Sequence, residues 1–219
     1  MSGSFQEIIE RTKIFVFERL KNDSTGHDFF HVERVWKLSC RIAKSEGAHL
    51  PIVELAALLH DIADWKFHGG NLEKGPKEAR KWLQSQKLVP SQIEAIVQII
   101  SKISFKGARV KEDTLSLEAM VVQDADRLDA LGAIGIARCF AYGGYKGNPF
   151  YDPKILPTMH QSAKEYIESK TTSINHFYEK LLLLKDRMHT LTGKEIAQER
   201  HRFMENFLKQ FLKEWHEGH

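Results

Sequence analysis

The segment from Pro51 to Asp64 constrains the fold of this chain more than any other part of the sequence. Its string VELAALLHDIA is apolar almost without interruption. It is not enriched in β-branched residues, and Glu54, Leu55 and Ala56 are good helix formers. Pro51 stands at a first-turn position, which helices tolerate. We therefore predict a helix over 51–64, buried at the centre of the fold.

Helical spacing of apolar residues dominates the remaining sequence. It predicts helices at 5–21, 28–46, about 76–88 and 91–104, and one long helix over 115–142. It also predicts two C-terminal helices, one at roughly 158–192 with a break near Ser173 and one at 193–216. Residues 68–76, 105–114 and 143–157 have loop composition, and we find no convincing strand or repeat. The prediction is an all-α, compact single-domain helical bundle over 1–219, with a core at 20–140 and the helices of 143–219 packing on it.

Composition excludes several protein classes. The 219 residues, 42% hydrophobic and 28% charged, are typical of a globular domain, and a net charge of +3 is too small to indicate a nucleic-acid partner. Glutamates interrupt the N-terminal apolar positions, so we expect no signal peptide, and no apolar run approaches a membrane span. Cys40 and Cys139 form no CxxC pattern and are predicted to be buried free thiols, which suits a cytoplasmic protein.

The dipeptide His60-Asp61 ends the most apolar predicted helix. Burying Asp61 without a charged partner is costly, and no Lys or Arg stands near it in the sequence. A bound cation would neutralise the carboxylate, and His60 would share that cation; a helix cap or a buried hydrogen bond is the alternative. His31 lies four residues before Val35 and so can face the same core, as a second imidazole ligand or as an ordinary core histidine.

Asp124, Asp126 and Asp129 interrupt the predicted helix over 115–142. At 3.6 residues per turn, Asp126 and Asp129 lie on adjacent parts of one face and Asp124 points elsewhere, so at most two of them serve one site. Two imidazoles with two carboxylates suit Mn²⁺, Fe²⁺, Co²⁺, Ni²⁺ or Zn²⁺ and leave positions open for water and substrate.

The ordered pattern of His31, His60-Asp61 and Asp126 resembles that of the HD-domain metal-dependent phosphohydrolases over about residues 20–140. The strings HVERV, LLHDIA and DADRLDAL resemble the local contexts of that superfamily, and the last selects Asp126 as the ligand. Longer strings, such as ELAALLHDIADWKFH, look like the small stand-alone HD hydrolases of bacteria and fungi. The resemblance implies a helical HD-type fold and a divalent metal cofactor, with Mn²⁺ favoured and Co²⁺, Ni²⁺, Fe²⁺, Zn²⁺ or Mg²⁺ as alternatives.

Phosphate hydrolysis at a metal also needs a proton carrier and cationic groups. Asp64 is the candidate proton carrier because it lies one turn beyond Asp61, and related HD enzymes have an acidic residue at the matching place; a solvated carboxylate is the alternative. The cationic candidates are Lys66, His68, Lys102, Lys106 and Arg127. Of these we retain Lys102, Lys106 and Arg127 as catalytic candidates, although a solvated side chain is the default for any lysine.

Other polar residues receive weaker assignments. Asp129 is expected to support Arg127 or a ligand histidine, and His176 either reaches the pocket or makes an interhelical hydrogen bond. The earlier dipeptide His27-Asp28 is interpreted as a helix start, with Asp28 as N-cap or first-turn acid. His27 and His68 are the spare ligands that a second metal would need.

The predicted function is hydrolysis of a small phosphorylated molecule, most naturally a nucleotide. Either a triphosphate is cut to monophosphate and pyrophosphate, or a monophosphate to nucleoside. An alarmone pyrophosphohydrolase is an alternative that has lower weight, because Ala63-Asp64-Trp65 retains only half of that family's acidic pair. Cyclic-dinucleotide phosphodiesterases carry a GYP signature after the His-Asp dipeptide. This sequence has no such signature, so that activity has lower weight. A non-catalytic metal or nucleotide sensor predicts a damaged motif, which we do not see. We expect neither nucleic acid nor membrane as a partner, and the sequence does not indicate the oligomeric state.

Overall fold

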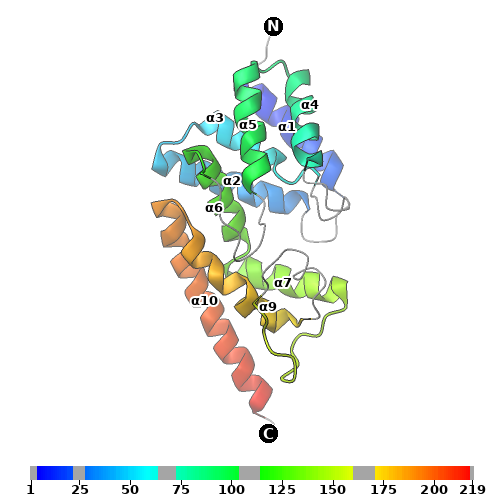
Figure 1. Ribbon diagram of the computed structural model, residues 1–219, viewed down its shortest axis with the longest axis vertical. Helices are drawn as coiled ribbons and strands as arrows, with labels where there is room; N and C mark the ends of the chain where they lie inside the picture. Colours follow the sequence, from blue (N-terminus) through cyan, green and yellow to red (C-terminus); the bar gives the residue numbers. More distant parts are fainter. Residues whose placement is uncertain (1–3, 22–27, 64–72, 104–113, 160–170, 218–219) are drawn as a thin grey trace. The chain divides into compact units, whose positions relative to one another are not determined.

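A computed structural model of the chain describes residues 4–21, 28–63, 73–103, 114–159 and 171–217 (Figure 1). All regular elements in these ranges are helices, which confirms the all-α prediction. They are α1 (Phe5–Leu20), α2 (Phe29–Glu46), α3 (Leu50–Leu59), α4 (Lys74–Ser85), α5 (Pro90–Ile103), α6 (Leu117–Asp129), α7 (Gly132–Lys146), α9 (Ser173–Glu179), the 3₁₀ helix η2 (Leu181–Arg187) and α10 (Leu191–His216). Among the described helices, none combines the length and apolarity that crossing a bilayer requires.

The described helices form two compact units whose boundary lies inside α6. The first unit contains α1 to α5 and α6 up to Ala125; the second contains α6 from Asp126 onward, α7, α9, η2 and α10. This boundary differs from the division near residue 143 suggested by loop composition. Whether the whole chain is one domain stays a prediction.

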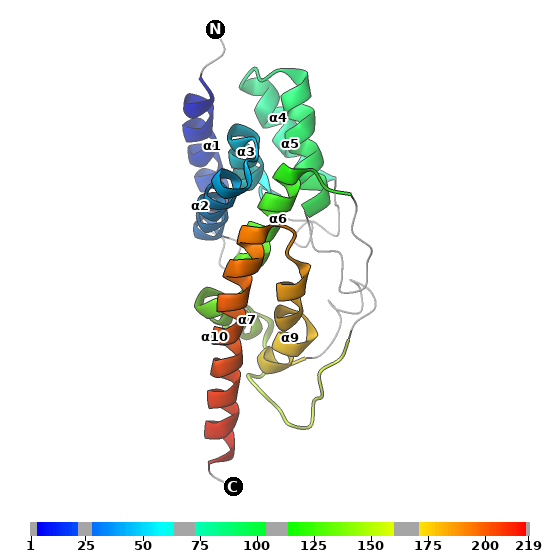
Figure 2. The same cartoon turned by 90° about the vertical axis from the view of Figure 1, so that its left-hand side faces the viewer.

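Helix α3 lies at the centre of the first unit, as its apolar sequence predicts, and packs against α1, α2 and α5 (Figure 2). Its residues from Leu55 to Leu59 are completely buried. The helix ends at Leu59, earlier than predicted, and His60 to Ala63 form turns. Two observations account for the early end: the His60 ring hydrogen-bonds to the Ala57 carbonyl, and the Ile62 amide bonds to Leu59 in a tighter three-residue turn.

The single helix predicted over 115–142 is wrong, because the chain breaks between α6 and α7. Leu131 is extended and Gly132 has φ +72°, a left-handed conformation that glycine adopts without the steric cost of a Cβ. Beyond the break, α7 runs on to Lys146, into the segment predicted to be a loop, and Gly147 in the left-handed conformation ends it.

The C-terminal helices also differ from their predicted bounds. Within the described part of 158–190, only Ser173–Glu179 is α-helical, followed by the 3₁₀ helix Leu181–Arg187. The predicted break near Ser173 coincides with the start of α9. The last break precedes Thr192-Gly193, because Thr190 is the N-cap of α10 and accepts a hydrogen bond from the Gly193 amide at 3.0 Å.

Aromatic side chains form the core of the second unit. Phe177 of α9 is fully buried and stacks on Phe207 of α10 at a centroid distance of 5.8 Å. Phe140 of α7 lies 6.2 Å from Phe177 and 6.0 Å from Phe207, so that one cluster joins three helices.

Candidate metal centre

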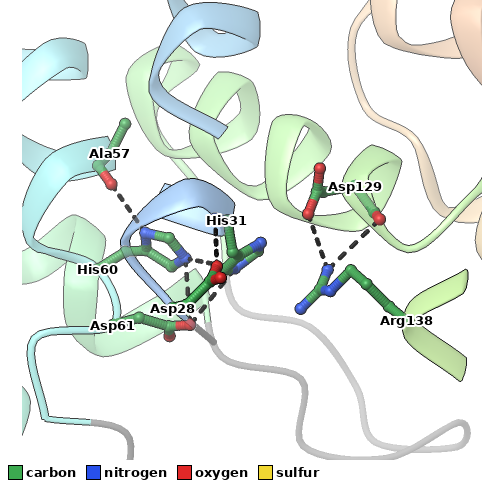
Figure 3. Close-up of polar contacts among 7 residues, drawn as sticks. All are labelled: Asp28, His31, Ala57, His60, Asp61, Asp129 and Arg138. Atoms are coloured by element: carbon green, nitrogen blue, oxygen red, sulfur yellow. Dashed lines mark hydrogen bonds and ion pairs between the residues drawn. The ribbon is translucent and has the colours of Figure 1, made fainter. Parts of the chain in front are cut away.

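Three potential ligand atoms converge where α2 begins and α3 ends (Figure 3). The Nε2 atoms of His31 and His60 are 3.4 Å apart. Asp61 Oδ2 lies 3.4 Å from His31 Nε2 and 3.5 Å from His60 Nε2. His31 is completely buried, like Val35 one turn later, which confirms that the two residues face the same core.

The orientation of the His60 ring is set by its own helix. Its Nδ1 lies 2.8 Å from the Ala57 carbonyl oxygen, which can only accept, so Nδ1 carries the proton. The lone pair of His60 is then on Nε2, which faces His31 and Asp61 (Figure 3). Fixing a ligand histidine through the other ring nitrogen is the usual arrangement at metal sites.

Asp126 on α6 adds a second carboxylate to the two histidines. One ligand atom from each of His31, His60 and Asp126 lies within 4.8 Å of the others. Among the described residues, Asp61, Asp124 and Asp129 do not belong to this group; Asp61 lies near the two histidines but is not grouped with Asp126. Asp126 is partly exposed, whereas its neighbours Ala125 and Arg127 are buried.

The residues present fit a divalent transition metal. A tetrahedral ion about 2.0–2.1 Å from nitrogen and oxygen ligands separates those ligands by roughly 3.3–3.4 Å. The triangle formed by the two Nε2 atoms and Asp61 Oδ2 has edges of 3.4, 3.4 and 3.5 Å. Two imidazoles with carboxylates are the donors that Mn²⁺, Fe²⁺, Co²⁺, Ni²⁺ and Zn²⁺ accept. A cation would also offset the partial burial of the Asp61 carboxylate, whose side chain is 16% exposed.

The N-terminal ends of the helices that carry His60 and Asp126 are joined away from the ligands. The amide of His49, the N-cap residue of α3, donates to Glu118 Oε1 in the first turn of α6 at 3.2 Å. Burial raises the pKa of Glu118, but hydrogen bonds from its own amide, from the His49 amide and from Ser116 outweigh burial and hold that pKa below 4.5.

Asp28 is the N-cap of α2, the first of the two roles predicted for it. Its side chain accepts a hydrogen bond from the His31 amide, with Asp28 Oδ1 and His31 N 2.9 Å apart (Figure 3). The sequence analysis placed Asp28 correctly at the helix start but did not connect it with the ligand His31.

Several predicted site residues lie outside the described residues: His27, Asp64, Lys66, His68 and Lys106. Their roles stay predictions. Lys102, at the end of α5, is described, and its ammonium donates to the Thr114 carbonyl oxygen at 3.3 Å. Its role in phosphate binding also stays a prediction.

Arg127 is buried, and its guanidinium contacts residues of the second unit. It donates to the Arg187 carbonyl oxygen and lies 3.3 Å from His189 Nε2. These contacts join α6 to the end of η2, which is a structural role; binding of phosphate by Arg127 stays a prediction.

Asp129 has a partner that its sequence context did not suggest. Its Oδ2 accepts from Arg138 of α7 at 2.9 Å, and its backbone oxygen lies 3.4 Å from the same guanidinium nitrogen (Figure 3). This pair spans the break between α6 and α7. No local signal connects residues nine apart across a helix break, so the sequence does not reveal it.

Comparison with known proteins identifies the family. The HD domain model matches residues 28–131, a range that contains all four predicted ligands. An HD-superfamily hydrolase from Bacillus thuringiensis is 43% identical, with 98% of this chain and 100% of that chain covered and a TM-score of 0.77. A protein of known structure from Lactobacillus plantarum is 40% identical, with 96% and 97% covered and a TM-score of 0.85.

A third relative is YpgQ of Bacillus subtilis, which is 38% identical over 206 residues, covering 94% of this chain and 92% of YpgQ. A crystal structure of YpgQ in complex with ADP has a TM-score of 0.76, with 96% of each chain covered. With relatives this similar over nearly its full length, the chain belongs to the HD-domain family, and it is an HD-type phosphohydrolase.

Proposed function

We propose that this enzyme hydrolyses a phosphate ester or anhydride bond of a nucleotide, with a divalent cation, Mn²⁺ being favoured, held by His31, His60, Asp61 and Asp126. The observation that carries the proposal is the convergence of two histidine Nε2 atoms and one Asp61 oxygen at 3.4–3.5 Å. The ADP complex of YpgQ supports a nucleotide as the class of substrate.

When bound, a divalent cation supplies charge that offsets the negative phosphoryl oxygens and lowers the pKa of water. The protein's contribution is a set of imidazole and carboxylate ligands. The Ala57 carbonyl oxygen orients the His60 imidazole, and the Asp28 cap bonds the backbone amide of His31. In the proposal Asp64 moves the proton, and Lys102 and Lys106 bind phosphate oxygens.

The proposal retains both reactions inferred from the sequence: release of pyrophosphate from a triphosphate and release of inorganic phosphate from a monophosphate. Alarmone pyrophosphohydrolase activity remains the second enzymatic alternative. Arg127 would have to exchange its bond to the Arg187 carbonyl oxygen for a phosphate, which makes it the weakest of the cationic candidates.

The test uses the full chain, stripped of metal and then supplied with Mn²⁺, Co²⁺, Mg²⁺ or Zn²⁺. The substrate panel contains nucleoside mono-, di- and triphosphates, alarmone and a generic phosphatase ester, and phosphate and pyrophosphate are measured separately. Asp61→Asn changes one ligand with little change of shape. Asp186→Ala removes a carboxylate whose side chain is 80% exposed and serves as the matched control.

We expect metal-dependent turnover of at least one nucleotide, abolished in Asp61→Asn and retained in Asp186→Ala. The phosphate product then identifies the bond that is cut. Metal and nucleotide binding without turnover of any panel member would refute catalysis and favour the sensor alternative. Turnover that survives chelation, or that Asp61→Asn leaves unchanged, would refute the metal site.

A further inference from the structure

Among the described ligands, His31 is the one carried by α2, and its position depends on how that helix begins. His60 and Asp61 follow one another at the end of α3, where the Ala57 carbonyl oxygen orients His60. His31 is the third residue of α2, and its backbone amide is one of the four that an α-helix leaves without an internal partner.

The Asp28 carboxylate satisfies that amide at 2.9 Å. The Asp28 backbone is extended, with φ −73° and ψ 175°, while its carbonyl oxygen accepts from the Val32 amide at 3.3 Å, so the residue is a full N-cap. The first turn of α2 contains no other acidic residue that could replace Asp28. The backbone of the residue that supplies the ligand is therefore held by the side chain of Asp28.

We propose that Asp28 is a positioning residue for the metal site: its cap fixes the first turn of α2 and thereby places His31 Nε2 opposite His60 and Asp61. This inference rests on the proposed metal-dependent function. The inference rests on two contacts of one residue. The backbone amide of His31 is capped by Asp28, and the imidazole of the same residue lies near His60 and Asp61.

The proposal separates the cap from the charge of Asp28. Asparagine caps a helix as well as aspartate does, so Asp28→Asn keeps the hydrogen bond and removes the charge. Asp28→Ala removes both. Thr190→Ala is the matched control, because Thr190 caps α10 in the same way, with Gly193 and no metal ligand at the third position.

The experiment titrates Mn²⁺ into the metal-stripped full chain and measures free Mn²⁺ by its electron paramagnetic resonance signal. Circular dichroism confirms that each variant is folded. We expect Asp28→Ala to weaken Mn²⁺ binding on the order of tenfold, as loss of a group that supports a ligand does. Asp28→Asn should bind within about twofold of the wild type. Thr190→Ala should leave Mn²⁺ affinity unchanged although it lowers the melting temperature.

Wild-type affinity in Asp28→Ala would overturn the inference and leave the metal site intact. Equal losses in Asp28→Ala and Asp28→Asn would overturn it too, because they would assign the effect to charge. Equal losses of Mn²⁺ affinity in Asp28→Ala and Thr190→Ala would also overturn the inference, because they would assign the effect to general destabilisation of the fold. If Asp28→Ala does not fold, Asp28→Gly replaces it, since glycine at an N-cap destabilises a helix much less than alanine does. A wild-type chain that binds no Mn²⁺ would overturn the proposed function itself.

Discussion

The contact between α7 and α9 allows a sharp test of packing in the second unit. A Cβ added to Gly143 would lie 2.2 Å from Ser173 Oγ, well inside the 3.0 Å that real Cβ contacts require, and 3.5 Å from Ser173 Cβ. Ser173 is 3% exposed, and its hydroxyl has no hydrogen-bond partner among the described residues. Gly143→Ala must therefore displace a buried side chain or separate the two helices.

Two effects of opposite sign set the magnitude. Forcing an extra methyl into a packed interface costs about 1–3 kcal/mol. Replacing glycine by alanine inside a helix gains up to about 1 kcal/mol. The neighbouring Gly144 supplies the control, because a Cβ there meets nothing within 4 Å. Since the helix-forming gain is common to both, the difference in stability between Gly143→Ala and Gly144→Ala isolates the clash, at about 1–3 kcal/mol.

The assay is urea unfolding followed by circular dichroism, in the wild-type and Ser173→Ala backgrounds. Ser173→Ala removes an unpaired buried hydroxyl and should itself be close to neutral. In that background the atom 2.2 Å away is gone, so the difference between the two glycine variants should largely vanish. Equal stabilities of Gly143→Ala and Gly144→Ala, or a difference that Ser173→Ala leaves unchanged, would refute the packing argument.

Three further predictions concern titration and burial. Because its pKa is lowered on folding, Glu118 should contribute stability above pH 4.5 that disappears as pH falls through its folded value; Glu118→Gln should melt below the wild type at pH 6, and this difference should shrink as the pH is lowered below 4.5. Cys40 and Cys139 are free thiols, as predicted, but have intermediate exposure rather than being fully buried; because partial burial raises the pKa of both to about 12, both should react slowly with alkylating agents at pH 8 and faster in denaturant, and rapid labelling of the native chain would contradict this. Arg127→Gln should lower the melting temperature of the metal-free chain by several degrees, because it removes the donor to the Arg187 carbonyl oxygen; an unchanged melting temperature would argue against a structural role.

Local chemistry explains which parts of the fold are predictable from sequence. The buried α3 follows from a run of apolar helix formers, and the start of α2 follows from Asp28, whose short carboxylate caps the third amide. Both depend on residues close together in the chain.

The break between α6 and α7 illustrates what sequence does not reveal. Gly132, Gly135, Gly143 and Gly144 all lie in the same apolar stretch, yet only Gly132 has positive φ. The other three continue the helix. Nothing in the local sequence distinguishes them, because the turn depends on contacts with distant parts of the second unit, such as the Arg200 side chain packed 3.1 Å from the Gly132 Cβ position.

The candidate site likewise has features that the sequence predicts and features that it does not. The identities of His31, His60, Asp61 and Asp126 follow from residue types, order and family resemblance, and the structure brings His31, His60 and Asp126 together. The partners of Arg127 and Asp129 are long-range contacts without a sequence signal.

The central claim is that the two facing histidines and their carboxylates hold a divalent metal. Its most direct test is calorimetric titration of Mn²⁺ into the metal-stripped wild type, His60→Ala and His216→Ala, the last being an exposed histidine near the end of α10. The account predicts a strong site in the wild type that is retained in His216→Ala and lost in His60→Ala. Undiminished Mn²⁺ binding by His60→Ala would contradict it.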